Sequence, residues 1–170
     1  MTEPTPFLPK PVHTVIDAQL EAAQRRAVIA AALSWCGTPY RQCGYTKGPR
    51  GAVDCSMLLV GAIVEGRVYE AFDPRPYSPV WFMARSEEKY LAWLNTVAVE
   101  VDTPKPGDII AYRVGRCFAH SGIVADDTFL VHAYAKTKKC TRTELTTPDL
   151  AKRPKKYFDI WQRIRSLSNG

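Results

Sequence analysis

Residues 53–64 read VDCSMLLVGAIV, a short polar step followed by an apolar run. Asp54 stands directly ahead of this run and predicts a helix N-cap, and the apolar residues behind it predict a buried helix. Cys55 would then lie in the first turn. The free N–H groups and partial positive charge of a helix N-terminus lower the pKa of a thiol and favour a nearby anion. Cys55 is therefore the leading candidate for a nucleophile.

The chain upstream of this helix predicts another helix and a long loop. Small and apolar residues recur at helical spacing from Asp17 to Cys36. Residues 37–51 contain four glycines and two prolines, which predict a loop. Downstream, residues 86–94 predict a third helix with Ser86 as its cap.

The second half of the chain changes to strand patterns. Strands are predicted for residues 109–114, 120–124 and 129–134, with edge strands at 141–145 and 159–164. Helices first and strands afterwards predict an α+β domain with an antiparallel sheet.

His120 and His132 fall on two neighbouring predicted strands. If Ile123 pairs with Phe129, the two histidines lie opposite each other on one face of a hairpin. Thiol catalysis needs a nucleophile, a base and a group that orients the base, and Cys55 with the two histidines supplies one of each. Such a pair of thiolate and imidazolium predicts a bell-shaped pH profile. The alternative interpretation is structural, because a lone buried cysteine is more often part of the core.

Length and composition favour one domain. The 170 residues, 46% of them hydrophobic, suit a single domain over residues 16–165, with a flexible segment at 1–15 and a tail at 166–170. The N-terminal segment lacks the basic start, apolar run and cleavage site of a secretory signal, so no export route is expected. Nowhere do 18 apolar residues run together, so no membrane span is expected.

The charge balance is basic. The chain has 23 Lys and Arg against 17 Asp and Glu, a net charge of +6, which favours polyanions such as nucleic acid, anionic lipid or acidic wall polymer. No nucleic-acid motif accompanies this charge, so we interpret it as a solvated basic rim and expect no nucleic-acid partner.

The five cysteines are an odd number and do not fit a disulfide framework. Zinc-ligand types occur in Cys117, His120, His132 and Cys140. Their spacing is not that of the two-cysteine knuckles of structural zinc sites, so we predict no metal and no cofactor.

Several groups of residues resemble, in order, the NlpC-type family of cell-wall peptidases. They are 37–40 (GTPY), 54–56 (DCS), 106–110 (PGDII), 120–124 (HSGIV) and 131–133 (VHA). The resemblance covers residues 27–134 and implies a papain-like fold, with the cysteine at a helix N-terminus packed on the sheet. It also implies an endopeptidase that cuts the peptidoglycan stem peptide between D-glutamate and the following diamino acid.

The resemblance also implies roles by position. Cys55 would be the nucleophile, His120 the base and His132 the group that orients the base. Tyr40 would lie near the oxyanion, and Asp54 and Ser56 beside the oxyanion or substrate. The sequence departs from the family pattern at residues 41–44, which read RQCG where the family has an aromatic residue and two glycines, and at Met57, where it has glycine. These departures concern the loop, the pocket and the cleaved bond more than the type of reaction.

A narrower resemblance is to family members in the tails of bacteriophages, prophages and gene transfer agents. Residues 77–79, 85–91 and 115–121 carry it. It implies tail-tip or hub proteins as partners and a place in the virion tail. The protein would be made in the host cytoplasm and would act on the host cell wall, in the periplasm, during genome entry.

Two alternatives stay open. One is a structural tail-tip assembly protein that keeps the peptidase fold. The other is an amidase or acyltransferase on the same fold, for which Trp81, Phe82 and Trp93 would line an apolar groove, although aromatic residues at such spacings are more often core.

Overall fold

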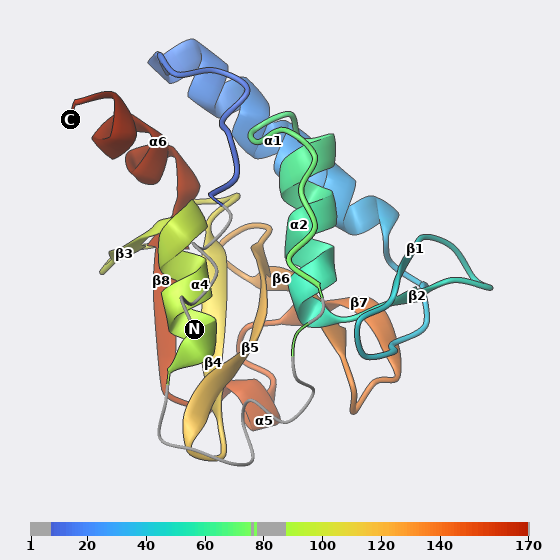
Figure 1. Cartoon of the computed structure of the whole chain (residues 1–170). Helices are drawn as coiled ribbons and strands as arrows, with labels where there is room; N and C mark the ends of the chain where they lie inside the picture. Colours follow the sequence, from blue (N-terminus) through green and yellow to red (C-terminus); the bar gives the residue numbers. More distant parts are fainter. Residues whose placement is uncertain (1–7, 76, 78–87, 170) are drawn as a thin grey trace, which may run out of the picture.

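The chain runs from a helical first half into a meander of strands (Figure 1). The computed structural model describes residues 8–75, 77 and 88–169. Its helices are α1 (Ala18–Ser34), α2 (Cys55–Glu65), α4 (Lys89–Val97), α5 (Pro148–Ala151) and α6 (Ile160–Ser168). Its strands are β1 (Tyr45–Thr46), β2 (Ala52–Val53), β3 (Val99–Val101), β4 (Ile109–Val114), β5 (Cys117–Val124), β6 (Phe129–Tyr134), β7 (Lys139–Glu144) and β8 (Lys155–Asp159).

The main sheet has six strands in the order β3-β8-β4-β5-β6-β7, and all neighbours are antiparallel. The short strands β1 and β2 form a separate antiparallel pair. This arrangement confirms the predicted α+β class.

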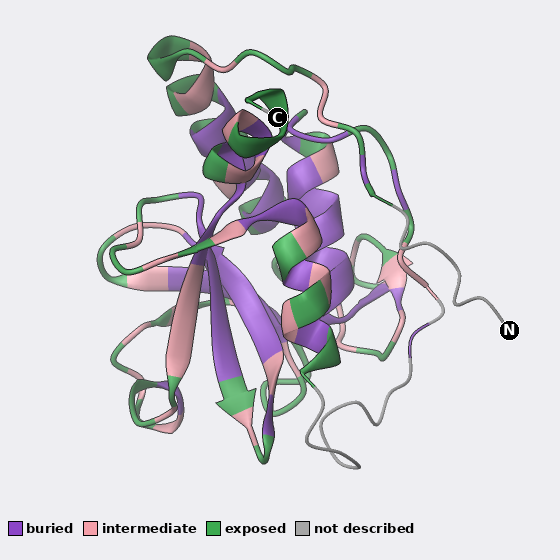
Figure 2. Cartoon of the chain, turned by 60° about the vertical axis from the view of Figure 1, so that its left-hand side comes forward, coloured by how far each residue is buried: buried purple, intermediate pink, exposed green. Residues whose placement is uncertain are grey.

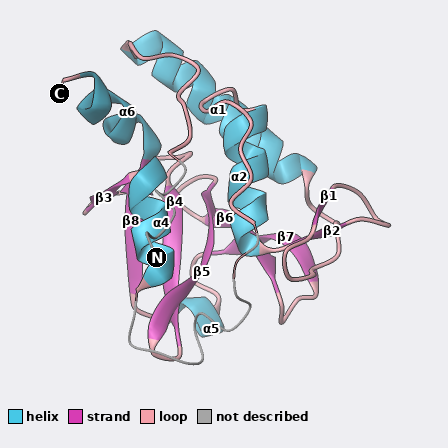
Figure 3. Ribbon diagram, viewed as in Figure 1, coloured by secondary structure: helices cyan, strands magenta, loops and turns pink. Residues whose placement is uncertain are grey.

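Two predicted helix starts are confirmed by their caps. The Asp17 carboxylate accepts the Leu20 N–H at 2.7 Å at the start of α1, and the Asp54 carboxylate accepts the Met57 N–H at 2.9 Å at the start of α2. The two helices lie side by side (Figure 3). A methyl group at Gly61 of α2 would come within 2.8 Å of the Trp35 indole, so glycine allows this close approach.

The core divides between the two faces of the sheet because side chains alternate along each strand. Figure 2 shows α2 and the middle strands as the most deeply buried elements. The larger cluster packs one face of the sheet against α1, α2 and α4, and it includes Ile109, Ala111, Ile123, Val131 and Leu94. The smaller cluster on the other face includes Ile110, Tyr112, Val124, Leu130 and Leu150 of α5.

Ion pairs of Arg25 connect α1 to the sheet. The Arg25 guanidinium lies 2.7 Å from the Asp108 carboxylate, 3.0 Å from that of Asp159 and 2.8 Å from that of Glu21. It also stacks over the Trp161 ring, 4.1 Å from the ring centroid. Three carboxylates and an aromatic ring thus surround one cation between α1, the start of β4 and α6.

The third predicted helix exists as α4, and its described part begins at Lys89 after Glu88. The predicted cap Ser86 lies outside the described residues. The predicted edge strand over 159–164 is wrong. Asp159 ends β8, which lies between β3 and β4, and its carboxylate accepts the Gln162 N–H at 3.0 Å to begin α6. Ile160, Trp161 and Ile164 then bury one face of that helix, at helical and not strand spacing.

The predicted register of the β5–β6 hairpin is wrong by two residues, because Ile123 pairs with Val131 and not with Phe129. The cause is the turn. The Asp126 carboxylate accepts the N–H groups of Thr128 and Phe129, both at 2.8 Å, and this holds a longer loop between the strands. A shift of two residues leaves every side chain on its predicted face.

Near the N-terminus, the Val12 N–H donates to the Val68 carbonyl at 2.9 Å, and the Lys10 carbonyl accepts the Glu70 N–H at 2.8 Å. The predicted limits of the domain at 16 and 165 stay a prediction. Among the residues described, none of the helices has the length and apolar character needed to cross a membrane.

Candidate active site

Cys55 is the first residue of α2, and this helix packs against β5 and β6. The thiol lies 3.8 Å from the carbonyl oxygen of Ala119, within reach of a weak sulfur hydrogen bond. Ala119 is an extra residue in β5, since His120 pairs with Tyr112 while Phe118 pairs with Arg113. Bulges of this kind re-aim neighbouring side chains and occur beside active sites.

The electrostatic setting of Cys55 differs from the sequence expectation. Burial raises the pKa of the thiol to about 11, and the nearby Asp54 carboxylate adds to the rise. Hydrogen bonds from Ser121 and Ser56 only partly oppose this effect on the pKa. The expected lowering by the helix N-terminus is therefore outweighed by the loss of water around the sulfur. The Cys55 thiol is therefore neutral at pH 7.

His120 and His132 are joined directly, as predicted, although by a different register. The Nε2 atom of His120 and the Nδ1 atom of His132 lie 2.8 Å apart, and both rings are buried. With Ile123 opposite Val131, His132 lies opposite Gly122, so the histidine pair is diagonal. A methyl group at Gly122 would come within 3.0 Å of the His132 Cβ and 2.6 Å of the Val131 carbonyl oxygen. Glycine thus makes room for the imidazole pair.

Both imidazoles are neutral at pH 7. Burial lowers the pKa of His120 well below its usual value, and the adjacent His132 lowers it further. Burial lowers the pKa of His132 to about 4. The His120 ring is packed between Tyr112 and Tyr134, with ring centroids 6.1 and 4.5 Å away. These aromatic neighbours explain the loss of hydration.

Cys55 and His120 are not hydrogen-bonded to each other in the structure. The thiol's hydrogen-bond acceptor is the backbone one residue before the imidazole. In unliganded enzymes catalytic hydrogen bonds are often long or poorly aligned and tighten when substrate binds. The histidine pair is thus formed, and the Cys55 thiol lies against the backbone next to His120 without a hydrogen bond to the imidazole.

Tyr40 lies in the loop between α1 and α2, and backbone bonds fix it on two sides. Its N–H donates to the Lys138 carbonyl at 2.8 Å, while the neighbouring Arg41 N–H donates to Val53 at 3.1 Å. Burial raises the pKa of the Tyr40 phenol, and the charges of Cys55 and Asp54 raise it further. The phenol therefore keeps its proton and can act as a hydrogen-bond donor near the thiol.

Asp54 and Ser56 flank Cys55 and differ in their contacts. The buried Asp54 carboxylate accepts the N–H groups of Met57 and Cys43, the latter at 2.7 Å, and the phenol of Tyr77 at 2.6 and 2.8 Å. These bonds hold the start of α2 and the loop before it. The Asp54 carboxylate is therefore hydrogen-bonded to groups of the protein itself. Ser56 instead lines a cavity.

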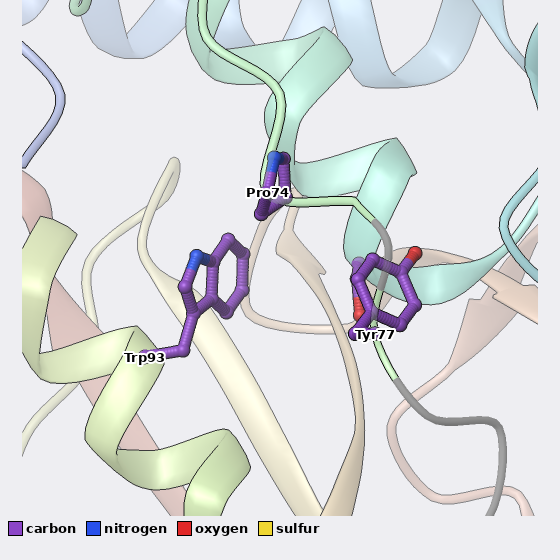
Figure 4. Close-up of a pocket in the computed structure, with 4 residues that line it drawn as sticks. Pro74, Tyr77 and Trp93 are labelled. Atoms are coloured by element: carbon purple, nitrogen blue, oxygen red, sulfur yellow. The ribbon is translucent and has the colours of Figure 1, made fainter. Parts of the chain in front are cut away.

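This cavity of about 30 Å³ lies next to Cys55 and is lined by Ser56, Pro74, Tyr77 and Trp93. Figure 4 shows the Trp93 indole, from α4, facing Pro74, while the Tyr77 ring lies beside the start of α2. Its volume suits one or two water molecules or a group the size of a methyl. Trp81 and Phe82, predicted with Trp93 to line an apolar groove, lie outside the described residues.

Sequence reasoning missed two hydroxyl groups beside the thiol. The phenol of Tyr90 on α4 is hydrogen-bonded to the Ser121 hydroxyl on β5, and both residues are buried. Ser121 also hydrogen-bonds the sulfur of Cys55. In the sequence Tyr90 is one apolar position of a helix, and its spacing carries no sign of this contact.

Cys36 and Cys140 form a second pair of neighbouring thiols. None of the five cysteines forms a disulfide, and Cys36 is exposed near the buried Cys140. A hydrogen bond from Cys140 lowers the pKa of Cys36 to about 7. Within the described ranges, no group of three or more His, Cys, Asp or Glu side chains has the arrangement of a metal site.

Comparison with solved structures identifies the fold. The chain is similar to NlpC1 from Trichomonas vaginalis, with a TM-score of 0.57 and 16% identity over 85% of this chain and 45% of that protein. It is similar to the peptidoglycan hydrolase RipB from Mycobacterium tuberculosis, with a TM-score of 0.57 and 20% identity over 85% of this chain and 68% of RipB. The P60 domain of an antigen from M. avium subspecies paratuberculosis gives a TM-score of 0.55 and 16% identity over 84% of this chain and 98% of that domain.

These likenesses confirm the predicted papain-like fold of NlpC/P60 type. The chain spans about half the length of NlpC1 and of the related NlpC2, 45% and 50% respectively. No protein-family model matches the sequence, and the search of curated proteins gave no match.

Proposed function

We propose that this protein is a cysteine peptidase that hydrolyses the peptide stem of peptidoglycan. The observation that carries the proposal is the hydrogen-bonded pair of His120 and His132 beside the helix-starting Cys55. It occurs in a fold shared with RipB, a peptidoglycan hydrolase. Nucleophilic catalysis by a thiol needs this combination of groups.

In this mechanism the Cys55 sulfur attacks the carbonyl carbon of the scissile amide while His120 takes the thiol proton. The Nε2 atom of His120 is engaged by His132, so Nδ1 is the nitrogen left to receive that proton. His120 then gives the proton to the leaving amine, and a thioester remains on Cys55. A water molecule attacks the thioester, and its proton returns through His120 to the sulfur as the acid product leaves.

The oxyanion would be stabilised by two donors. As the first residue of α2, Cys55 has a backbone N–H without an acceptor inside the helix. The Tyr40 phenol, which keeps its proton, would be the second donor. Its hydrogen bond to Gln42 is long, at 3.4 Å, so the hydroxyl is easily redirected to a substrate. Loss of one such donor costs about 2.7–4 kcal/mol in the transition state.

The substrate bond that we propose lies between D-glutamate and the following diamino acid. The resemblance around Cys55 supports this choice, and the small cavity at Ser56 would accept a group the size of a methyl next to the nucleophile. Arg41 and Gln42 are exposed in the loop that departs from the family pattern, so this loop would contact the substrate differently.

The setting that we propose is the tail of a bacteriophage or related particle, with tail-tip or hub proteins as partners and action on the host cell wall. The support is the narrower resemblance over residues 77–79, 85–91 and 115–121. Much of the first two segments lies outside the described residues.

The test is mass spectrometry of fragments released from purified Gram-negative peptidoglycan by the wild type and by Cys55→Ala. Cys36→Ala is a matched control, because it removes an exposed thiol distant in sequence from the catalytic residues. We expect fragments cut after D-glutamate from the wild type and from Cys36→Ala, and none from Cys55→Ala. Equal digestion by Cys55→Ala would exclude the proposed nucleophile.

Two other products would redirect the function. No fragments from any variant would favour a structural tail-tip protein on this fold. Released acyl chains from a lipid or amide substrate would favour an amidase or acyltransferase, a function that the indole of Trp93 beside Ser56 would suit.

A further inference from the structure

A threonine on the edge strand β7 continues the hydrogen-bond chain of the two histidines. The Nε2 atom of His132 lies 3.0 Å from the Thr143 hydroxyl, and this hydroxyl lies 3.0 Å from that of Thr141. Together with the 2.8 Å bond between His120 and His132, three adjacent strands supply one unbroken series of polar groups.

The strand register explains why these groups meet. His132 pairs directly with Thr141 across β6 and β7, and Leu130 pairs with Thr143. Thr141 and Thr143 are two residues apart, so both hydroxyls lie on the same face as His132. The contact from His132 to Thr143 is diagonal, as is the contact from His120 to His132. Aromatic and long side chains can span such diagonal positions.

The direction of the protons in this series matters for catalysis. A neutral imidazole carries one N–H, and its position determines which nitrogen can accept a proton. His120 can act as a base at Nδ1 only if its own proton is on Nε2, where it donates to His132 Nδ1. His132 must then carry its proton on Nε2, and the acceptor for that proton is the Thr143 hydroxyl.

The opposite tautomer would disable the base. If His132 carried its proton on Nδ1, it would donate to Nε2 of His120, and the His120 proton would move to Nδ1. The Thr143 hydroxyl, as a hydrogen-bond acceptor at His132 Nε2, disfavours this tautomer, because accepting a hydrogen bond there requires a proton on that nitrogen. Thr143 in turn can donate its own hydroxyl proton to Thr141, which leaves its lone pairs facing His132.

We propose that Thr143 is a positioning residue that fixes the tautomer of His132 and, through it, the basic nitrogen of His120. The inference rests on the proposed peptidase function for its effect on rate, whereas its effect on the tautomer is independent of any activity.

The experiment compares Thr143→Val, Thr143→Ser and Thr141→Val. Thr143→Val keeps the branched shape and removes the hydroxyl, Thr143→Ser restores the hydroxyl, and Thr141→Val changes the outer member only. Ring ¹⁵N shifts of His132 report the tautomer, and steady-state hydrolysis of a stem peptide containing D-glutamate and a diamino acid reports kcat and KM. Thr143→Ala serves as a second variant if Thr143→Val does not fold.

We expect Thr143→Val to shift the protonated nitrogen of His132 from Nε2 towards Nδ1. We also expect kcat to fall about tenfold with KM unchanged, the effect of one lost hydrogen bond. Thr143→Ser should keep the wild-type tautomer and remain within about twofold of wild-type kcat. Thr141→Val should shift the tautomer less than Thr143→Val, because it removes only the acceptor of the Thr143 hydroxyl proton.

An unchanged His132 tautomer in Thr143→Val and Thr143→Ala would overturn the inference, whatever the activity. So would a Thr143→Val enzyme with wild-type kcat, or a Thr143→Ser enzyme as slow as Thr143→Val. A wild-type protein without peptidase activity would refute the proposed function instead, and the ¹⁵N shifts would still decide the role of Thr143.

Discussion

The Tyr77 phenol reaches both carboxylate oxygens of Asp54, at 2.6 and 2.8 Å. Asp54 is 2% exposed and caps the helix that begins with Cys55. The chain that follows α2 therefore returns to its start and satisfies the carboxylate next to the thiol. A buried carboxylate is costly unless it is fully hydrogen-bonded, so this contact links the stability of the domain to the position of the proposed nucleophile.

Tyr77→Phe tests this link. Removal of the phenol leaves a buried carboxylate with fewer donors, and hydrogen bonds to charged groups are worth about 1.5–3 kcal/mol. We expect the free energy of unfolding in urea at pH 7 to fall by that amount. Tyr45→Phe is the matched control, because within the described part of the chain its hydroxyl makes no hydrogen bond and its ring stacks on Trp35. Equal losses in the two variants would mean that the bond to Asp54 adds no stability.

The pH dependence of kcat/KM should have one limb and not the bell expected from the sequence. His120 has a pKa well below 6.5 and Cys55 a pKa of about 11, so between them both groups are neutral. The base is the neutral imidazole. Activity should therefore rise with pH through the lowered pKa of His120, below pH 6.5, and then stay flat from about pH 7 to 10.

Hydrolysis rates across this range provide the measurement, with circular dichroism at each pH to separate lost catalysis from unfolding. Activity that continues to rise from about pH 8 to 10 would show that the thiolate fraction limits the rate. The prediction that Cys55 and His120 are both neutral in the resting protein would then be wrong.

Thiol labelling should distinguish the exposed cysteine from the proposed nucleophile. Cys36 has a pKa of about 7 and is exposed, whereas Cys55 is buried with a pKa of about 11. At pH 7.5 the larger thiolate fraction of Cys36 outweighs the greater nucleophilicity of a more basic thiolate, so we expect iodoacetamide to label Cys36 roughly tenfold faster or more. Peptide mapping by mass spectrometry measures both rates, with Cys36→Ala as the control. Faster labelling of Cys55 would indicate a preformed thiolate in the resting protein.

The fold class and the positions of the candidate residues follow from local sequence signals. Asp54 ahead of an apolar run predicts both the cap and the helix start, and the two strands carrying histidines are predicted with the correct side-chain faces. Long-range contacts do not follow from such signals. The turn at Asp126 moves the hairpin register by two residues, and the pKa of Cys55 depends on burial, which no short motif encodes. Thr143 and Tyr90 reach the site only through sheet order and helix packing.

Gly122→Ala tests the space that the imidazole pair requires. The new methyl group would lie 2.6 Å from the Val131 carbonyl oxygen and 3.0 Å from the His132 Cβ, so β6 must move. Overpacking of this kind costs about 1–3 kcal/mol of stability. We also expect kcat to fall more than about tenfold, because a displaced His132 no longer orients His120. Steady-state kinetics and urea unfolding on the same samples are the measurements. A variant with wild-type kcat would show that the diagonal histidine contact tolerates movement.

The ion cluster around Arg25 gives the last prediction, which concerns how α1 is held on the sheet. The Arg25 side chain is 11% exposed, and those of its partners Asp108 and Asp159 are 1% and 2% exposed. Removing one partner of a buried ion pair leaves uncompensated buried charge and costs about 3–5 kcal/mol. Arg25→Met should therefore lower the free energy of unfolding in urea by that amount at pH 7. Arg26→Met, on the exposed side of the same helix, should change it by less than about 0.5 kcal/mol.

Arg25→Lys separates charge from geometry. An ammonium group keeps the positive charge but lacks the planar fork that reaches two carboxylates at once, so its loss of stability should be intermediate. Residue 25 also packs over Trp161, a contact that methionine largely preserves. If Arg25→Met were no less stable than Arg26→Met, this packing and not the ion cluster would hold α1 against the start of β4 and α6.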